Sequence, residues 1–198
     1  MTTISVGFKT DVGKRRSNNE DSYCVLRGAD LHNRLDGLYV VADGMGGGRA
    51  GDVASRIVAQ VVPDAVQEAL MERNGFGLEG PAVLLRGAVE RANQAVWSRQ
   101  VEQTELAGMG TTCVAALLSN GEITIANIGD SRAYLLRDGR LSQITQDHSE
   151  VWQQVLAGNL TRDQARRSKY RNAITRAVGL SASVTADIDT ISLQEGDT

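Results

Sequence analysis

The chain has few of the residues that would set it apart from ordinary globular proteins. Of its 198 residues only two are cysteine, two are proline and two are histidine, and aromatic residues make up 4%. Cys24 and Cys113 both lie in apolar stretches, which is typical of reduced core thiols. Two distant cysteines and two histidines also argue against a cysteine-based zinc site. We therefore expect a cytoplasmic protein without a disulfide framework.

The sequence also lacks strong charge and long hydrophobic runs. The formal net charge is -3, and such a balance gives no indication of a nucleic-acid or anionic-membrane partner. No apolar run reaches the roughly 18 residues that a spanning helix needs. The N-terminus, "MTTISVGFKT", does not have the basic-then-apolar layout of a signal peptide. We expect a monomer that binds neither nucleic acid nor membrane.

Hydrophobic periodicity predicts an alternation of strands and helices. Strands are expected at about 3–8, 21–27, 37–42, 111–118, 122–128, 132–137 and 184–192. One long helix starts near Ala50, and Pro63 is expected to kink or restart it because proline removes a backbone donor. A second helix spans about 81–104, with Leu85, Val89, Ala92 and Val96 forming one stripe. Shorter helical stretches follow at about 149–157 and 161–167, and residues 74–81 are expected to form a loop.

Short connections between the strands at 111–118, 122–128 and 132–137 predict an antiparallel meander, because parallel strands need crossovers of a dozen or more residues. Two amphipathic helices with a largely antiparallel set of strands indicate an α+β layered fold. No repeat, low-complexity tract or linker divides the chain. We expect residues 1–198 to form a single domain.

The most informative stretch is "YVVADGMGGGRAG", residues 39–51. A glycine-rich loop after a strand often cradles phosphate, but this one lacks the Gly-Lys-Ser/Thr ending of a P-loop. The predicted meander also argues against a dinucleotide-binding βαβ fold. Asp43 ends an apolar run, where an unpaired charge is costly and metal coordination is a usual remedy. The glycines would leave the Gly44 carbonyl free as an oxygen ligand. A tight turn with a capping aspartate remains the alternative.

Two further stretches carry acidic residues. In "GKRRSNNED", residues 13–21, the basic residues precede Glu20 and Asp21. Mg²⁺ and Mn²⁺ prefer carboxylate and carbonyl oxygens, which Glu20 and Asp43 could supply. Arg16 could then hold a phosphate by bidentate hydrogen bonds. The alternatives are a solvated charged loop here and, for Asp130 in "GDSR" (129–132), an ordinary turn. His148 precedes a helical stretch, and its side chain could cap that helix or pair with a nearby residue.

No serine or cysteine nucleophile is evident, because no G-x-S-x-G elbow occurs and neither cysteine has an obvious histidine partner. Taken together, however, five segments resemble the type 2C metal-dependent serine/threonine protein phosphatases in their bacterial form. They are "DVGKRRSNNEDSY" (11–23), "YVVADGMGGGRAG" (39–51), "GMGTTCVAALL" (108–118), the stretch from 125 to 149 around "GDSR", and "RNAITRAVG" (171–179). They occur in the family's order and cover nearly the whole chain.

The resemblance implies a four-layer αββα sandwich of two mainly antiparallel sheets flanked by helices. It also implies a binuclear Mg²⁺ or Mn²⁺ centre at one end. In the family's motifs the arginine binds the substrate phosphate (Arg16) and the glutamate ligates one metal (Glu20). The next aspartate orients water (Asp21), and another aspartate bridges both metals (Asp43). The carbonyl of the following glycine (Gly44) completes part of the coordination shell of one metal ion, and the G-D-S-R aspartate (Asp130) contributes to a third, weakly held ion.

The resemblance implies hydrolysis of phosphoserine and phosphothreonine in proteins by a metal-activated water. The substrates would be targets of a Ser/Thr kinase, together with the kinase itself. The segment "SLQEGDT" (192–198) resembles the strand entry before the family's S-D-G motif, and neither that motif nor the later D-N motif follows. We therefore expect a domain truncated before its last metal-ligand motifs. The alternative function is that of a catalytically impaired fragment or pseudophosphatase that binds phosphoproteins or regulates them.

Overall fold

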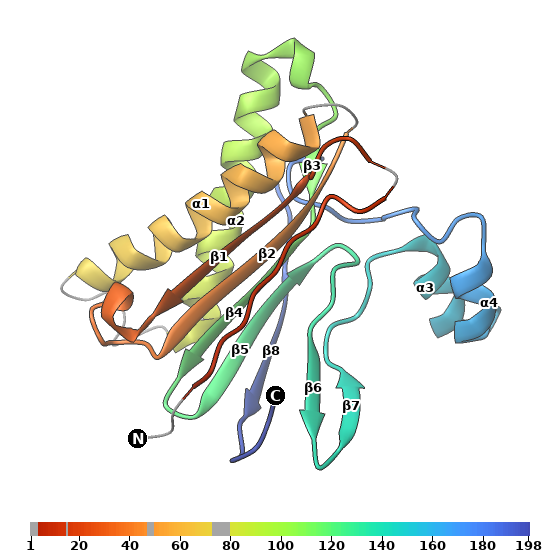
Figure 1. The fold of residues 1–198 in the computed structure, drawn as a ribbon. Helices are drawn as coiled ribbons and strands as arrows, with labels where there is room; N and C mark the ends of the chain where they lie inside the picture. Colours follow the sequence, from red (N-terminus) through yellow and green to blue (C-terminus); the bar gives the residue numbers. More distant parts are fainter. Residues whose placement is uncertain (1–3, 15, 47–49, 73–79) are drawn as a thin grey trace.

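A computed structural model describes residues 4–14, 16–46, 50–72 and 80–198. Its centre is a six-stranded antiparallel sheet in the order β1-β2-β4-β5-β8, with β3 paired to the end of β2 (Figure 1). The strands are β1 (Asp21–Arg27), β2 (Gly37–Met45), β3 (Gly110–Thr111), β4 (Cys113–Ser119), β5 (Glu122–Ile128) and β8 (Asp187–Ser192). Short 3-10 turns occur at Gly28–Leu31 and Thr104–Leu106.

Two long helices, α1 (Ala50–Met71) and α2 (Gly80–Glu102), lie side by side and cover one face of the sheet (Figure 1). On α1, Ala54, Val58, Val62 and Val66 recur every four residues and are fully buried, as expected for an amphipathic helix. The predicted stripe on α2 is also buried. These residues pack against β2, β4 and β5 in one hydrophobic core. Burial of the two stripes therefore fixes the helices on the sheet.

The predicted break at Pro63 does not restart the helix, because α1 continues as one element through it. Pro63 is buried, so its ring contributes to packing while one backbone hydrogen bond is lost. The observed bounds of α1 and α2 otherwise agree with the prediction. Residues 47–49 of the glycine-rich stretch, and residues 73–79 of the predicted loop at 74–81, lie outside the described residues.

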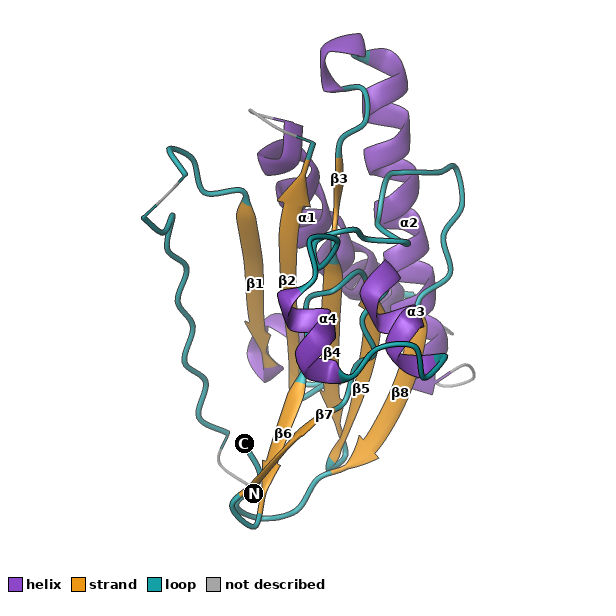
Figure 2. Ribbon diagram, turned by 90° about the vertical axis from the view of Figure 1, so that its right-hand side faces the viewer, coloured by secondary structure: helices purple, strands orange, loops and turns teal. Residues whose placement is uncertain are grey.

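A separate antiparallel hairpin consists of β6 (Tyr134–Arg137) and β7 (Arg140–Gln143) (Figure 2). The predicted meander is correct for β4 and β5 but wrong for its third strand, because β6 pairs with β7 and β5 pairs with β8. Asp138 and Gly139 both have positive φ, at 52° and 73°. This two-residue turn is a strong hairpin signal that favours the local pairing.

The remaining helices, α3 (Glu150–Leu156) and α4 (Arg162–Arg167), lie beyond the end of the sheet (Figure 1). Ser149 and Thr161 cap them, each accepting a hydrogen bond from a backbone N–H three residues later. The strand predicted at 3–8 is absent from its described part, residues 4–8. Instead this segment crosses the sheet face opposite the helices, where the Phe8 and Tyr23 rings lie 5.2 Å apart.

The α+β class and the antiparallel sheets flanked by helices are thus confirmed, with strands at six of the seven predicted places. Among the described residues, no helix combines the length and the apolar character needed to cross a bilayer. The acidic residues singled out in the sequence lie near one end of this sheet, where β2 ends and β5 turns away.

Candidate metal centre

A pocket of about 680 Å³ lies at that end of the sheet. Five of the six predicted site residues line it: Arg16, Glu20, Asp43, Gly44 and Asp130. They come from the loop before β1, the end of β2 and the turn after β5, so that three segments distant in sequence converge. The fold therefore brings together the carboxylates that the motifs singled out.

Asp43 and Asp21 are neighbours across the β1–β2 pair, where their Cα positions are in register. Although Asp43 is solvent-accessible, partial burial of its carboxylate, followed by the nearby charge of Asp21, raises its pKa from 3.8 to about 6. Arg16 opposes this rise and Asp130 adds to it. Negative charge is therefore concentrated at Asp43 and is only partly compensated by the protein, which favours a cation nearby.

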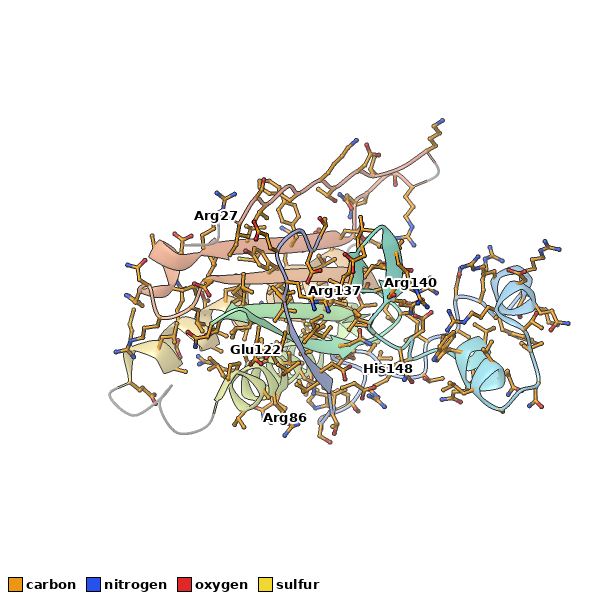
Figure 3. The ribbon with its side chains drawn as sticks, turned by 90° about the horizontal axis from the view of Figure 1, so that it is seen from below. Arg27, Arg86, Glu122, Arg137, Arg140 and His148 are labelled. Atoms are coloured by element: carbon orange, nitrogen blue, oxygen red, sulfur yellow. The ribbon has the colours of Figure 1, made fainter. Side chains whose placement is uncertain are left out.

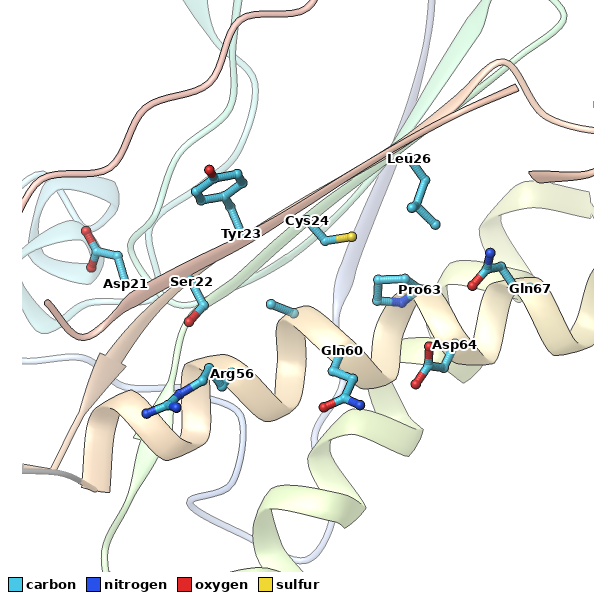
Figure 4. Close-up of a pocket in the computed structure, with 11 residues that line it drawn as sticks. Asp21, Ser22, Tyr23, Cys24, Leu26, Arg56, Gln60, Pro63, Asp64 and Gln67 are labelled. Carbon is cyan, nitrogen blue, oxygen red and sulfur yellow. The ribbon is translucent and has the colours of Figure 1, made fainter. Parts of the chain in front are cut away.

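Asp21 is the predicted site residue that does not line this pocket. Figure 4 shows its side chain on the same side of β1 as Tyr23, whereas Ser22, Cys24 and Leu26 point toward α1. This alternation follows from the period of two in a strand. A second pocket, of about 580 Å³, lies between β1 and α1, and Asp21 is one of the residues that line it. Asp21 thus lies beside Asp43 without forming the wall of the acidic pocket.

Gly44 allows a close approach of three backbone segments. A Cβ on Gly44 would lie 2.1 Å from the Gly51 carbonyl oxygen and 2.8 Å from that of Glu20, distances that no side chain tolerates. The Gly44 N–H donates to the Glu20 carbonyl at 3.1 Å. The start of α1 and the loop before β1 therefore both pack on the backbone of Gly44, which explains why a glycine follows Asp43.

Arg16 and Glu20 contact each other directly. Arg16 Nη1 donates to Glu20 Oε2 at 2.9 Å, with the arginine side chain 61% exposed and the glutamate 12% exposed. A pair at the surface in which the arginine is solvated contributes little to stability, about 0–1 kcal/mol. The guanidinium can therefore turn toward an anion at the rim of the pocket at low cost, while Glu20 stays held against the protein.

Asp130 follows Gly129 in the turn after β5. Burial raises the pKa of Asp130, and the carboxylate of Asp147 adds to the rise. The Asp147 carboxylate is already paired with an arginine, because Arg132 donates to it through Nε at 2.8 Å and through Nη2 at 2.5 Å. Asp130 has no such arginine partner among the described residues, so its carboxylate faces the pocket as an available oxygen donor.

These residues fit a hydrated Mg²⁺ or Mn²⁺ ion. The available donors are carboxylate and carbonyl oxygens, the ligands that hard cations prefer. Within the described part of the chain, no three His, Cys, Asp or Glu side chains cluster closely enough to enclose an ion. Mg²⁺, however, is usually bound by one or two carboxylates and keeps several waters. Burial is the main cause of the raised pKa values of Asp43 and Asp130, and a nearby carboxylate adds to each rise.

The structure adds pocket residues that the sequence had not marked. Thr112, Met45, Asn172 and Ile174 line the same pocket. Ile174 reaches it because its segment pairs with Ser149 in an isolated β-bridge. Thr112 belongs to the motif "GMGTTCVAALL", but strand alternation alone gives no sign that its hydroxyl faces the site. Asn172 and Ile174 similarly lie in a motif without any ionisable side chain at those positions.

Known proteins share this fold and much of this sequence. The serine/threonine phosphatase stp of Listeria welshimeri is 36% identical over 191 residues, which cover 96% of this chain and 73% of the relative. The crystal structure of serine/threonine phosphatase Stp1 from Staphylococcus aureus aligns with a TM-score of 0.80 and 35% identity, covering 92% of this chain and 68% of that one. The fold is therefore that of the bacterial serine/threonine phosphatases.

Another solved structure is the catalytic domain of the phosphatase PstP in complex with two manganese ions. It aligns with a TM-score of 0.75 and 34% identity, and the alignment covers 96% of this chain and 72% of that one. A family model described as protein phosphatase 2C matches residues 14–181. The chain belongs to the protein phosphatase 2C family, whose members named here are protein serine/threonine phosphatases.

Proposed function

We propose that the chain hydrolyses phosphoserine and phosphothreonine in proteins at a centre that holds two Mg²⁺ or Mn²⁺ ions, with a third held more weakly near Asp130. The observation that supports this most directly is the convergence of Arg16, Glu20, Asp43 and Asp130 on one pocket. The two manganese ions of the related PstP structure support the same cofactor here.

In this proposal Asp43, Glu20, Asp130 and the Gly44 carbonyl hold the cations. When bound, divalent cations supply positive charge that polarises a phosphoryl group and makes water a stronger nucleophile near neutral pH. Arg16, exposed at the rim, binds the phosphate oxygens and neutralises the charge that develops on them. Asp21, beside Asp43, accepts a hydrogen bond from the attacking water and so orients it.

The substrates in this proposal are phosphorylated proteins, namely the targets of a Ser/Thr kinase and the kinase itself. The segment 149–171 stands beside the pocket because Asn172 and Ile174, which follow it, line the pocket wall. Its basic patch consists of Arg166 and Arg167 at the end of α4 and of Lys169 and Arg171 just after it. We propose that these basic residues contact the polypeptide around the phosphorylated residue. We also propose that residues 1–198 belong to a single catalytic domain and that the protein acts in the cytoplasm as a monomer.

The test is hydrolysis of p-nitrophenyl phosphate and of a phosphothreonine peptide by the purified chain. We expect hydrolysis with Mn²⁺ or Mg²⁺ and none with EDTA. Asp43→Asn should abolish it, whereas Glu90→Gln, an exposed acid-to-amide change on α2, should leave it unchanged. Activity that persists in EDTA would contradict the metal-dependent mechanism.

A second candidate function is a phosphoprotein-binding or regulatory module with an impaired centre. The observation that favours it is that no three metal-ligating side chains cluster within the described residues. This candidate predicts that a phosphothreonine peptide binds with Mn²⁺ present, requires Arg16, and is not hydrolysed. Calorimetric titration beside the hydrolysis assay separates the two functions, because only the enzyme turns the peptide over.

A further inference from the structure

Asp43 and Asp130 lie on different segments that the fold brings to one pocket. Asp43 is near the end of β2, and Asp130 lies in the turn after β5. A shared cation needs its oxygen donors held within a fraction of an ångström of the productive geometry. Two buried polar side chains outside the predicted set of ligands, Thr112 and His148, bind the backbone at these two points.

Thr112 binds both backbone polar groups of Asp43. The Asp43 N–H donates to Thr112 Oγ1 at 2.9 Å, and the Thr112 N–H donates to the Asp43 carbonyl at 2.9 Å. Thr112 is only 1% exposed, so loss of its hydroxyl would leave a largely buried N–H group without its acceptor. The backbone that carries the Asp43 carboxylate is therefore held by one residue that lies between β3 and β4.

The same threonine also contacts the turn that carries Asp130. Thr112 Oγ1 is 2.6 Å from the hydroxyl of Ser131, the residue after Asp130. Gly129 has φ of +102°, and a Cβ there would lie 2.6 Å from Thr112 Cγ2. The hydroxyl and the methyl group of Thr112 thus touch the residues on either side of Asp130.

His148 binds Gly129 from the other side in the same two-bond manner. The Gly129 N–H donates to His148 Nδ1 at 3.0 Å, and the His148 N–H donates to the Gly129 carbonyl at 2.9 Å. An accepting Nδ1 leaves the proton of a neutral ring on Nε2, which lies 2.9 Å from Asp187 Oδ2.

Asp187 is held in turn by Arg176, whose Nη1 lies 2.6 Å from Oδ1 and 3.1 Å from His148 Nε2. His148 is 7% exposed. In Figure 3 it lies at the end of the sheet from which the chain continues toward α3. The ring is therefore fixed from both of its nitrogens.

We propose that Thr112 and His148 are positioning residues, which together set the Asp130 turn relative to Asp43 and thereby determine the affinity of the pocket for a divalent cation. The proposal rests on the metal centre of the proposed function. Its chemistry is that of partners that orient metal ligands, whose loss typically weakens metal binding roughly 10- to 100-fold. Here the partners act through the backbone, so we expect about a tenfold effect.

Mn²⁺ affinity, measured by calorimetric titration of the full chain with Mn²⁺ alone, tests the role of Thr112. Thr112→Val keeps the shape but leaves the Asp43 N–H without its acceptor, so we expect about tenfold weaker binding. Thr112→Ser retains the hydroxyl and should bind within about threefold of the wild type. The matched control is Thr124→Val, which removes an equally buried hydroxyl bonded to Thr190 in the same sheet and should leave Mn²⁺ affinity unchanged.

The role of His148 is tested by two amides that imitate different ring nitrogens. In His148→Asn the amide oxygen can occupy the place of Nδ1 and accept from Gly129, so Mn²⁺ affinity should stay within about threefold. In His148→Gln the amide reaches the place of Nε2 and leaves the Gly129 N–H unbonded, so affinity should fall about tenfold. Equal effects of the two variants would contradict the assigned role of Nδ1.

The other outcomes are also decisive. If the wild-type chain binds no Mn²⁺, the proposed function itself fails. If the wild type binds and folded Thr112→Val binds equally well, or Thr124→Val weakens binding equally, only the positioning role is overturned. Should Thr112→Val not fold, as judged by circular dichroism, Ser131→Ala removes the same hydroxyl pair at a partly exposed position. It should then weaken Mn²⁺ binding severalfold, and unchanged binding would overturn the proposal.

Discussion

Replacing Asp43 by asparagine should stabilise the metal-free protein while abolishing hydrolysis. The pKa of Asp43 is raised from 3.8 to about 6, first by burial and then by the charge of Asp21. The folded protein therefore binds a proton at this group more tightly than the unfolded chain does. The stability of the wild type should fall as the pH rises from about 4 to about 6, because stability decreases wherever the folded state binds more protons.

The expected gain in the free energy of unfolding follows from the size of the pKa shift of Asp43. A rise in pKa from 3.8 to about 6 corresponds to about 3 kcal/mol at neutral pH, at ~1.4 kcal/mol for each pH unit. Asp43 is solvent-accessible, and screening by water reduces such energies. We therefore expect Asp43→Asn to raise the free energy of unfolding by about 1 kcal/mol at pH 7.5, and by close to zero at pH 4, where the carboxyl is mostly protonated in the fold.

Urea unfolding in EDTA at these two pH values measures the effect. Asp189→Asn removes an exposed carboxylate from β8 in the same sheet and controls for the loss of one negative charge from a chain of net charge -3. With Mn²⁺ at 100 times its dissociation constant the order should reverse, since the wild type would gain about 2.7 kcal/mol. If Asp43→Asn is no more stable than the wild type in EDTA at pH 7.5, the acidic cluster is not electrostatically strained.

Three further predictions concern other parts of the site and the core. Arg16→Lys should raise KM for a phosphopeptide roughly tenfold, because lysine loses the bidentate geometry. Mn²⁺ affinity, measured calorimetrically, should not fall, and an unchanged KM would exclude Arg16 as the phosphate ligand. Gly44→Ala should lower the urea stability by about 1–3 kcal/mol through overpacking. The control Gly87→Ala on α2, where a Cβ meets nothing within 4 Å, should raise it by about 0.5–1 kcal/mol. Burial raises the pKa of the Cys113 thiol to about 12, so mass spectrometry should show maleimide labelling of Cys113 only after unfolding. Rapid labelling of Cys113 in the native protein would contradict its core position.

The positions of the strands and the site could be predicted because the acidic residues end or precede clear apolar runs. Asp43 lies near the end of β2 and Glu20 precedes β1, so pairing these two strands brings the two side chains close. The register that places Asp21 opposite Asp43 is a tertiary property, set by burial of Cys24 and Leu38 on the helix side. Periodicity shows which face a residue lies on, but it does not show which residue it faces.

Where the sequence interpretation failed, the choice of strand partners decided the outcome. The third strand of the meander was assigned to β5 by chain proximity, whereas Asp138 and Gly139 close a local hairpin and leave the edge of β5 to β8. The predicted strand at 3–8 has no pairing partner among the described strands. Strand propensity without a partner does not give a strand, since the ladder bonds supply the stability.

The roles of Thr112 and His148 could not be predicted from the sequence. Both lie in motifs of the family, but a buried threonine in a strand is usually a packing residue. A lone histidine before a helix is compatible with a cap. Only the hydrogen bonds to Asp43 and Gly129 show that the two side chains hold the backbone of the acidic pocket. Such contacts depend on the relative placement of three strands and cannot be inferred from any one of them.

The most direct test of the central claim is a crystal structure of the protein grown with Mn²⁺, with data collected at the manganese absorption edge. The account predicts anomalous density in the pocket in contact with the Asp43 carboxylate, with Arg16 turned toward the remaining open space. Manganese bound elsewhere on the chain, with none at Asp43 in a crystal saturated with the ion, would contradict the assignment of this pocket as the metal centre.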